Sequence, residues 1–276
     1  MYKKEFDLSN KTALITGAGG LLGFYHAASL LECGCSVVIT DILKNSLIQT
    51  EKNLNKEYKN CKISSYVMDV TDPDSINNIS NLLVSNKQEV DILINNAALD
   101  PKVKICLEDN NPTKFENFSK AQWNKEIEVG LTGAFLCSQV FGAKMAQNKK
   151  GVILNIASDL SVIAPDQRIY KKKDDFDNNQ FFKPVTYSAI KTGLIGLTKY
   201  IATYWAKDGI RCNAISPGGV FNYQDEEFIK NVIKLIPLGR MANKDEYKSA
   251  VKFMCSDASS YMTGFNMVID GGRHIW

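Results

Sequence analysis

The stretch Thr16-Gly17-Ala18-Gly19-Gly20-Leu21-Leu22-Gly23 decides the fold of this 276-residue chain. It follows a short β-branched run, residues 12–16, and opens an apolar-periodic segment, residues 22–33. A strand, a tight turn and a helix therefore follow one another. Glycines in such a turn let backbone N–H groups and a helix N-terminus approach a pyrophosphate, whose negative charge the helix dipole favours. The stretch predicts the first half of a dinucleotide-binding βαβ unit.

Outward from this turn, short β-branched runs alternate with longer helical patterns. The expected strands are residues 12–16, 36–40, 63–68, 91–95, 151–157, 211–215 and 267–269. The expected helices are residues 22–33, 46–58, 73–85, 120–147 and 185–207, with more helix beyond. This order requires right-handed crossovers and a parallel sheet with helices on both faces. We expect one doubly wound α/β domain of about seven strands over residues 1–276, because no linker rich in Pro, Gly or Ser divides the chain.

Asp41 ends the second expected strand, 18 residues after Gly23. A carboxylate at this place accepts hydrogen bonds from a ribose diol and repels a 2′-phosphate. We therefore predict NAD rather than NADP as the cofactor. For an isolated aspartate, a cap or loop position would be an equally good interpretation. The neighbouring glycine stretch favours the cofactor.

A tyrosine and a lysine lie four residues apart in Thr186-Tyr187-Ser188-Ala189-Ile190-Lys191. Four residues make one helical turn, so both side chains leave the same face of a helix. A fixed ammonium within a few ångströms stabilises the phenolate and lowers the tyrosine pKa from its reference value of about 10. The pair can then exchange a proton with an alcohol or a carbonyl oxygen. Taken alone, the pair also fits a solvated helix surface.

The composition excludes several classes of function. The net charge is +3 with both signs interspersed, which gives no footprint for nucleic acid. No segment approaches the roughly 20 apolar residues that span a bilayer, and the charged N-terminus lacks a signal core, so we expect a cytoplasmic protein without a membrane partner. The seven cysteines have no paired C-x-x-C spacing. We interpret them as reduced core residues, and we expect no metal site.

With these motifs in order, the chain resembles the short-chain dehydrogenase/reductase family over nearly its whole length. The landmarks are Thr16–Gly23, Asp69-Val70, Asn95-Asn96-Ala97-Ala98, Ser158, Tyr187 with Lys191, Pro217-Gly218 and Asp270-Gly271-Gly272. The resemblance implies a Rossmann-like sheet, a small-molecule substrate, and a homotetramer or homodimer with residues 120–147 and 185–207 as interface candidates. It also implies hydride transfer between a nicotinamide and a secondary alcohol or ketone.

The resemblance further implies roles for individual residues. Tyr187 would exchange a proton with the reacting oxygen, Lys191 would hold the nicotinamide ribose and lower the tyrosine pKa, and Ser158 would orient that oxygen. The cofactor-binding residues that it implies are Gly17, Gly19, Gly20, Leu21, Leu22, Gly23, Asp41, Asp69, Val70, Asn96, Ala97, Ala98, Tyr187, Lys191, Pro217, Gly218, Val220 and Asn222. In isolation, Ser158 would be read as a turn residue and Lys191 as a surface lysine.

A second tyrosine competes for the catalytic position. Tyr170 lies 12 residues after Ser158, close to the usual separation in the family, whereas Tyr187 lies 29 residues after it. Asp174, four residues past Tyr170, would raise a nearby tyrosine pKa, and the segment around it is too charged for a core helix. We therefore prefer Tyr187.

This choice makes residues 165–183 an inserted loop near the site, and residues 99–118 form a second long loop. Candidate lid contacts in the first are Arg168, Tyr170, Phe181 and Phe182. A loop that merely covers the helix end or a neighbouring subunit is the equal alternative. Lys102, Lys104, Glu108 and Asp109 lie in the second loop. Together with Arg168, the lysines of this second loop could bind a phosphorylated or otherwise polar substrate.

Three positions depart from the family pattern. Leu21 replaces a glycine of the nucleotide motif, Gly130 replaces an asparagine that holds a relay water, and Asn222 replaces a threonine. They motivate an alternative function, a non-catalytic dinucleotide-sensing protein of the same fold. A further alternative is an NADP-dependent carbonyl reductase, which Asp41 opposes.

The substrate expectation comes from a weaker resemblance. Residues 129–135, 164–167 and 237–242 are similar to bacterial family members linked to flagellin modification and to amino-sugar or nonulosonate biosynthesis. On that resemblance, we expect the reacting hydroxyl to belong to a sugar, an amino sugar or a sugar phosphate.

Overall fold

A single parallel sheet forms the centre of the molecule. The computed structural model describes residues 4–99, 111–171 and 180–276. The strands are β1 (Thr12–Ile15), β2 (Ser36–Asp41), β3 (Ile63–Val67), β4 (Ile92–Asn95), β5 (Gly151–Ile156), β6 (Ile210–Pro217) and β7 (Asn266–Ile269). All neighbours pair in parallel, in the order β3-β2-β1-β4-β5-β6-β7. The expected doubly wound α/β fold is confirmed. Its order reverses between β1 and β4, where such sheets bind ligands.

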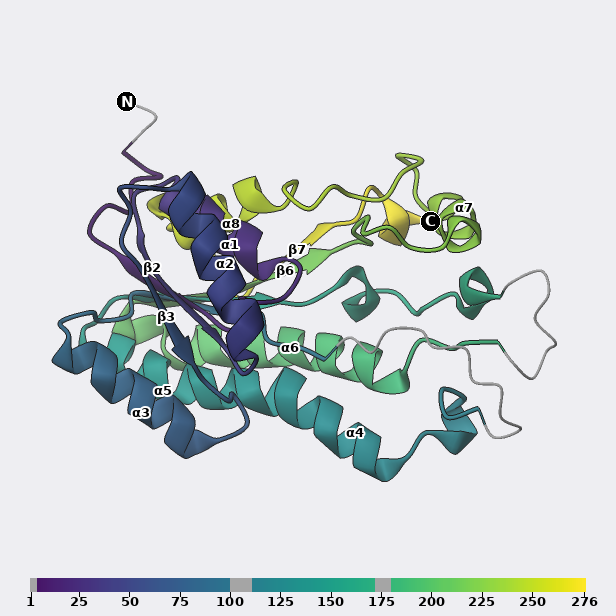
Figure 1. The fold of residues 1–276 in the computed structure, drawn as a ribbon, viewed down its shortest axis with the longest axis horizontal. Helices are drawn as coiled ribbons and strands as arrows, with labels where there is room; N and C mark the ends of the chain where they lie inside the picture. The colour runs from purple at the N-terminus through teal and green to yellow at the C-terminus, as the bar shows by residue number, and fades with distance from the viewer. Residues whose placement is uncertain (1–3, 100–110, 172–179) are drawn as a thin grey trace.

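Helices cover both faces of this sheet (Figure 1). They are α1 (Gly23–Leu31), α2 (Lys44–Glu57), α3 (Pro73–Ser85), α4 (Lys120–Ile127), α5 (Gly133–Gln147), α6 (Val185–Tyr204), α7 (Glu226–Ile233) and α8 (Lys248–Cys255). Helices α1, α2 and α8 lie on one face, and α3, α5 and α6 lie on the other, with α4 leading into α5. Helix α7 lies apart from both layers, near the C-terminus.

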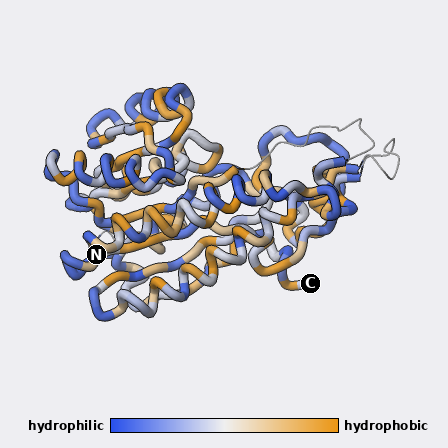
Figure 2. Tube along the Cα trace, turned by 90° about the horizontal axis from the view of Figure 1, so that it is seen from below, coloured by the Kyte–Doolittle hydropathy of each residue, from blue (hydrophilic) through white to orange (hydrophobic). Residues whose placement is uncertain are grey.

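The strands alternate their side chains between two apolar cores. Ile15 and Ile94 pack with the α1 and α8 face, whereas Leu14 and Leu93 pack with the α3, α5 and α6 face. In Figure 2, hydrophobic residues in orange recur along the helices between hydrophilic residues in blue. Each fully buried Leu or Ile contributes about 1.5–3 kcal/mol relative to an exposed one. The two cores therefore hold the sheet rigid beneath the residues at its carboxyl edge.

Local caps explain where several helices begin. Asp72 accepts a hydrogen bond from the Asp74 N–H at 2.9 Å, and Pro73 starts α3. Ser119 likewise accepts the Gln122 N–H at 3.1 Å at the start of α4. A side-chain oxygen at such a position satisfies an N–H that has no partner within the helix. The structure confirms the predicted bounds of residues 73–85 without change.

The helix expected over residues 120–147 has these bounds in the structure, but its interior is not regular α-helix. A π-helical turn at Glu128–Thr132 separates α4 from α5. Gly130 in this turn faces α6 so closely that a Cβ would lie 2.8 Å from Ile190 Cγ2, and a Cβ at Gly133 would lie 2.7 Å from Val70 Cγ2. The wider π-helical turn accommodates the close contacts of both glycines. The helical periodicity of the sequence does not predict such a turn. The expected helix 185–207 also ends early, at Tyr204.

Two features of the chain bear on membranes and on the long loops. Among the helices of the described ranges, none has the length and apolar character needed to cross a bilayer. Lys102, Lys104, Glu108, Asp109 and Asp174, on which parts of the loop interpretation depend, lie outside the described residues.

Candidate active site

The predicted site residues follow the carboxyl ends of the strands. Thr16 follows β1, Asp41 ends β2, Asp69 comes two residues after β3, and Asn96 follows β4. Ser158 lies two residues after β5, Pro217 ends β6, and Asp270 follows β7. Carboxyl ends of parallel strands share one edge of the sheet, so the fold gathers these residues along that edge.

The glycine turn has the close packing that only glycine allows. Gly17 has a positive φ of 61°, and a Cβ there would lie 2.6 Å from Ala97 Cα. A Cβ on Gly23 would lie 2.5 Å from Ala18 Cα, so the first turn of α1 packs directly on the loop. Within the described residues, no side chain caps α1. Its first N–H groups are thus arranged to receive an anion.

Asn96 holds the turn rather than pointing out of it. Its Nδ2 donates to the carbonyl oxygens of Thr16 at 3.0 Å and Gly17 at 2.9 Å. Thr16 Oγ1 in turn accepts the N–H groups of Asn96 and Ala97, both at 3.1 Å. These bonds join the ends of β1 and β4 at the switch point of the sheet. We infer a supporting role for Asn96, with the exposed Ala98 beside it.

Asp41 lies against the same turn. Its Oδ2 accepts the Gly19 N–H at 2.9 Å, and its Oδ1 accepts the Leu43 N–H at 2.8 Å. These bonds aim a half-buried carboxylate along the glycine turn. Ionised carboxylate oxygens can accept more than one hydrogen bond each, so the group retains capacity for a ribose diol. Leu21 of the turn, the departure from the family glycine, is 41% exposed and leaves Gly17 and Gly23 in their close contacts.

The adenine-side residues predicted after β3 form a small turn. Asp69 Oδ1 accepts hydrogen bonds from the N–H and the hydroxyl of Thr71, at 2.9 and 2.7 Å. Val70 is buried against Gly133 of α5. Asp69 is half-buried beside this apolar contact.

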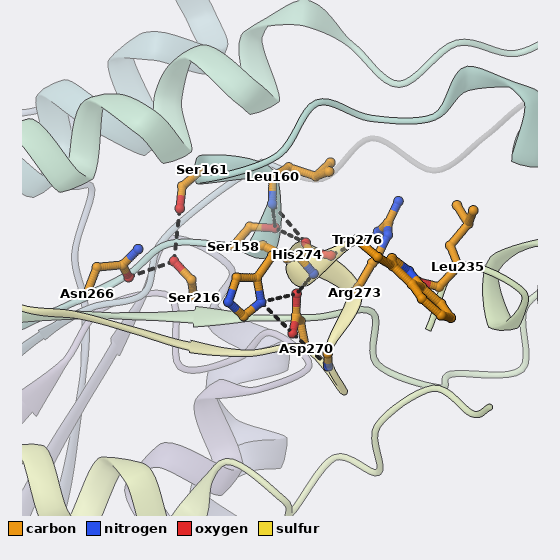
Figure 3. Close-up of polar contacts among 12 residues, drawn as sticks. Ser158, Leu160, Ser161, Ser216, Leu235, Asn266, Asp270, Arg273, His274 and Trp276 are labelled. Atoms are coloured by element: carbon orange, nitrogen blue, oxygen red, sulfur yellow. Dashed lines mark hydrogen bonds and ion pairs between the residues drawn. The ribbon is translucent and has the colours of Figure 1, made fainter. Parts of the chain in front are cut away.

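Ser158 begins a short 3₁₀ turn, Asp159–Ser161, directly after β5. Its Oγ donates to Asp159 Oδ1 at 2.8 Å and accepts the Leu160 N–H at 3.2 Å. Asp159 Oδ2 lies 2.9 Å from Arg273 Nη1, in a pair whose side chains are 5% and 9% exposed. The C-terminal turn therefore reaches the residue next to Ser158 (Figure 3). Neither Asp159 nor Arg273 was predicted from the sequence.

The C-terminal turn that carries Arg273 is itself ordered around Asp270. Its carboxylate accepts the N–H groups of Gly272 at 3.0 Å and of His274 at 2.8 Å, and it contacts the His274 ring at 3.0 Å. Trp276 Nε1 donates to the Leu235 carbonyl oxygen at 3.0 Å, as Figure 3 shows. These contacts fix the direction from which Arg273 meets Asp159.

Tyr187 and Lys191 lie one turn apart near the start of α6, as predicted. Lys191 is buried, and its Nζ donates to the Ile156 carbonyl oxygen at 2.8 Å, two residues before Ser158. The same Nζ lies 5.7 Å from the centre of the Tyr187 ring. Thr192 Oγ1 also donates to the Ser161 carbonyl oxygen at 3.4 Å. The structure therefore brings Tyr187 and Lys191 against the strand end and turn that carry Ser158.

Buried polar contacts anchor the start of α6. Thr186, next to Tyr187, bonds the carboxylate of Glu126 on α4. Gln122 Nε2 donates to the other oxygen of Glu126 at 2.5 Å. Glu126 and Thr186 are both buried, so this contact ties the helix turn that carries Tyr187 to α4. No sequence pattern pointed to this contact, because the two residues lie 60 positions apart.

A second ammonium lies beside Tyr187. Lys183 Nζ lies 3.9 Å from the centre of the Tyr187 ring. The Lys183 backbone is held by the Gln167 side chain, which accepts its N–H at 2.8 Å. From the sequence, residue 183 was only the end of an insertion.

The segment after β6 closes the other side of the site. Gly218 donates its N–H to the Ile269 carbonyl oxygen at 2.8 Å, and a Cβ there would lie 2.7 Å from Asp270 Cα. Tyr247 donates its hydroxyl to the Gly218 carbonyl oxygen at 3.2 Å, and burial raises the pKa of that tyrosine. Val220 is half-buried in a bridge with Ala242, and Asn222 is exposed.

The competing tyrosine belongs to an aromatic cluster. The Tyr170 ring lies 5.5 Å from Phe181 and 5.4 Å from Phe228 of α7, measured between ring centres. Tyr170 is thus part of the contact between the insertion and α7, whereas Tyr187 lies on α6 with Lys191. Arg168 pairs with Asp166, at 2.8 Å, and its side chain is 89% exposed.

The described flanks of the two long loops contact each other. Asn111 Nδ2 donates to the Gln180 carbonyl oxygen at 2.6 Å, and the Phe182 N–H donates to Thr113 Oγ1 at 3.0 Å. These described flanks are thus bonded to each other beside the start of α6.

The cysteines of the described residues give no sign of reactive chemistry. Six lie in the described residues, all as free thiols, and four are buried: Cys35, Cys137, Cys212 and Cys255. Burial raises the pKa of the Cys137 and Cys255 thiols to about 12. The seventh, Cys106, lies outside the described residues. No group of three metal-binding side chains occurs within residues 4–99, 111–171 and 180–276.

Comparison with known proteins gives matches over nearly the whole chain. The family described as short chain dehydrogenase matches residues 11–170, and the one described as enoyl-(acyl carrier protein) reductase matches residues 178–274. The 2-dehydro-3-deoxy-D-gluconate 5-dehydrogenase of Bacillus subtilis is 30% identical over 97% of this chain and 96% of the relative. The NAD-dependent glycerol dehydrogenase of Listeria innocua is 30% identical over 99% of this chain and 98% of the relative.

A solved structure extends the likeness to the fold. The gluconate 5-dehydrogenase of Burkholderia cenocepacia, in complex with NADP and tartrate, is 25% identical and superposes with a TM-score of 0.85, with all of both chains covered.

Proposed function

Because this chain belongs to the short-chain dehydrogenase/reductase family, we propose that it oxidises a secondary hydroxyl of a sugar, polyol or sugar acid with NAD. The single observation that carries the proposal is the position of the Lys191 ammonium. Its Nζ bonds the strand end before Ser158 and lies one helical turn from Tyr187. A serine, a tyrosine and a lysine are thereby held at the carboxyl edge of a nucleotide-binding sheet.

The residues at the switch point fit a dinucleotide. The start of α1 has no side-chain cap, and the turn packs closely on itself at Gly17 and Gly23, so its backbone N–H groups would receive a pyrophosphate. Asp41, bonded to the Gly19 N–H, would hold the adenine ribose. When bound, the nicotinamide supplies the hydride acceptor or donor.

The proton chemistry falls to this chain's own residues. During alcohol oxidation, the Tyr187 phenolate would take the hydroxyl proton, and during ketone reduction the phenol would return it. Lys191 would favour the phenolate by its charge, since its ammonium is fixed by Ile156. Ser158 Oγ would hold the reacting oxygen by a hydrogen bond. In this structure its proton lies toward Asp159, so Oγ can accept a bond from a substrate hydroxyl or rotate to donate one.

The preference for NAD rests on Asp41. A carboxylate bonded along the glycine turn would face a 2′-phosphate with like charge. The B. cenocepacia enzyme was solved with NADP, so family membership alone does not choose between the two cofactors. For this chain, the choice of NAD over NADP is proposed on the basis of Asp41.

The proposed substrate class follows the relatives. Their names specify a dehydrogenase of a sugar acid and one of glycerol, both molecules with several hydroxyls. The more specific links to amino sugars, sugar phosphates and flagellin modification remain predictions. The alternative of a dinucleotide sensor is motivated by Gly130, which has no room for the relay asparagine of the family.

A substrate panel tests the proposal. Formation of NADH or NADPH would be measured with gluconate, galactitol, glycerol, amino sugars and sugar phosphates, and with a hydroxysteroid and a hydroxyacyl thioester for comparison, with NAD and NADP offered separately. We expect turnover with at least one polyhydroxy compound and a preference for NAD. Turnover confined to steroids or acyl thioesters would contradict the substrate class, and equal use of NADP would contradict the role of Asp41.

We also propose a homo-oligomer that uses α5 and α6. Tyr200 and Tyr204 stack on the outer side of α6 with ring centres 5.7 Å apart, and they are 65% and 64% exposed. Phe135 of α5 is exposed as well. Exposed aromatic groups of this kind are enriched at interfaces. Sedimentation of the wild-type protein tests this, and a monomer at micromolar concentration would contradict it. A cytoplasmic location remains a prediction.

A further inference from the structure

Tyr187 lies beside two ammonium groups from different parts of the chain. Lys191 approaches from the same helix, with its Nζ 5.7 Å from the ring centre. Lys183 comes from the segment before α6 and lies closer, 3.9 Å from the ring centre, over the face of the ring. A cation within about 6 Å of an aromatic face is attracted by the ring's electron density.

The chain holds Lys183 at this place by its backbone. Gln167 Oε1 accepts the Lys183 N–H at 2.8 Å, and Gln167 Nε2 donates to the Lys183 carbonyl oxygen at 3.4 Å. Gln167 is itself bonded through its carbonyl oxygen to Gln180 Nε2 at 2.5 Å. The next residue, Pro184, is buried at the cap of α6. These bonds fix the backbone of Lys183 at the place from which its side chain reaches the Tyr187 ring.

The charged groups that the described residues place on the packed elements fall into two sets. The cations are Lys183 and Lys191. The carboxylates are Glu126 of α4, bonded to Gln122 and Thr186, and Asp159, bonded to Ser158 and Arg273. Asp166, near Gln167, is bonded to Arg168. Each of these described carboxylates has its own donors, and the ammonium groups of Lys183 and Lys191 lie 3.9 and 5.7 Å from the centre of the Tyr187 ring.

We propose that Lys183 is a second positioning residue for proton transfer, which stabilises the Tyr187 phenolate from the face of its ring. Ionisation spreads negative charge from the phenolate oxygen onto the ring carbons, so an ammonium over the ring is attracted more strongly to the phenolate than to the phenol. Lys183 thus lowers the tyrosine pKa in addition to Lys191, and it restricts rotation of the ring. The inference rests on the proposed function of Tyr187 as the acid-base group.

A titration without cofactor or substrate tests this proposal. Phenolate absorbance in the near ultraviolet is followed against pH for the full-length protein and for Tyr187→Phe, and their difference isolates Tyr187. We expect Lys183→Met to raise the pKa of Tyr187 by about 1 unit. Lys183→Arg should restore most of the wild-type value. Lys199→Met, an exposed lysine of the same helix, should leave it unchanged.

Kinetics with an uncharged and a charged substrate complete the test. If galactitol is a substrate, the acidic limb of its kcat/KM profile against pH should move to higher pH in Lys183→Met. The size of this move should match the rise in the pKa of Tyr187 seen in the titration. Identical Tyr187 titrations in wild type and Lys183→Met, with both proteins folded by circular dichroism, would overturn the proposal. So would a variant that raises only the KM for gluconate, because Lys183 would then be a carboxylate contact. An inactive wild type would refute the proposed function, while the titration would still report on Lys183.

Discussion

Arg273 Nη1 lies 2.9 Å from Asp159 Oδ2, so the last turn of the chain is bonded to the residue beside Ser158. The same carboxyl group accepts the Ser158 hydroxyl through its other oxygen at 2.8 Å. Both charged side chains are nearly buried. A buried charge is stable only with its partner in place, so Arg273 holds Asp159, and Asp159 sets the direction of the Ser158 hydroxyl.

Replacing Arg273 by Met should destabilise the protein by about 3 kcal/mol, because Asp159 would be left buried without its cation. Urea unfolding measures the change. The matched control is Arg240→Met, which removes a pair with Glu246 whose side chains are 52% and 36% exposed. Its free energy of unfolding should stay close to that of wild type, because solvent screens an exposed pair. Equal losses in the two variants would refute the special role of the buried pair.

His26 should make the stability depend on pH. Burial in α1 lowers the pKa of this histidine to about 4, from an ordinary value of 6.5. Below that ordinary value the unfolded chain binds a proton that the folded chain excludes, so stability is complete near neutral pH and falls as the pH drops. The loss should reach about 2 kcal/mol at about pH 5. In His26→Gln, the free energy of unfolding measured over the same pH range should lack this decrease at low pH. Parallel curves for the two proteins would argue against a neutral His26.

Gly130→Ala should cost about 1–2 kcal/mol, since its Cβ would lie 2.8 Å from the stiff, β-branched Ile190. Gly196→Ala, on α6 with nothing within 4 Å of its Cβ, should instead gain about 0.5–1 kcal/mol. A double-mutant cycle of Gly130→Ala with Ile190→Ala should show favourable coupling, because shortening Ile190 makes room for the new methyl group. Thermal or urea unfolding gives all of these values. A stabilising Gly130→Ala would show that Ile190 does not fill this place.

Sequence patterns predicted the fold because their signals are local. The glycine turn, Asp41 eighteen residues beyond it, and the alternation of strands and helices each need only a short window, and the parallel sheet follows from their order. The predicted helix over residues 73–85 has the same bounds in the structure, where Asp72 caps its first turn. The π-helical turn inside the long helix over residues 120–147 was not predicted, because Gly130 and Gly133 make their close contacts with residues distant in the sequence.

The missed parts of the site share a physical cause. Arg273 and Asp159 are 114 positions apart, and Glu126 and Thr186 are 60 apart, so no spacing in the sequence joins them. Lys183 precedes a proline and resembles any loop lysine until the fold brings it over Tyr187. Buried partners of a catalytic group become visible only when separate elements pack together.

Asp41→Asn should weaken the preference for NAD over NADP. Asparagine keeps an oxygen that can accept the Gly19 N–H but removes the negative charge that faces a 2′-phosphate. The ratio of kcat/KM for NAD to that for NADP should fall by about tenfold, which is about 1.4 kcal/mol. Calorimetric binding of each cofactor gives a second readout. An unchanged ratio would remove Asp41 from cofactor selection.

Turnover of Tyr187→Phe, compared with its affinity for NAD, tests the central claim most directly. The variant loses one hydroxyl and keeps the ring beside Lys183 and Lys191. With the best substrate of the panel, kcat should fall by at least about 100-fold while the dissociation constant of NAD stays within about twofold of wild type. Full turnover in Tyr187→Phe would contradict the assignment of Tyr187 as the proton-transfer residue.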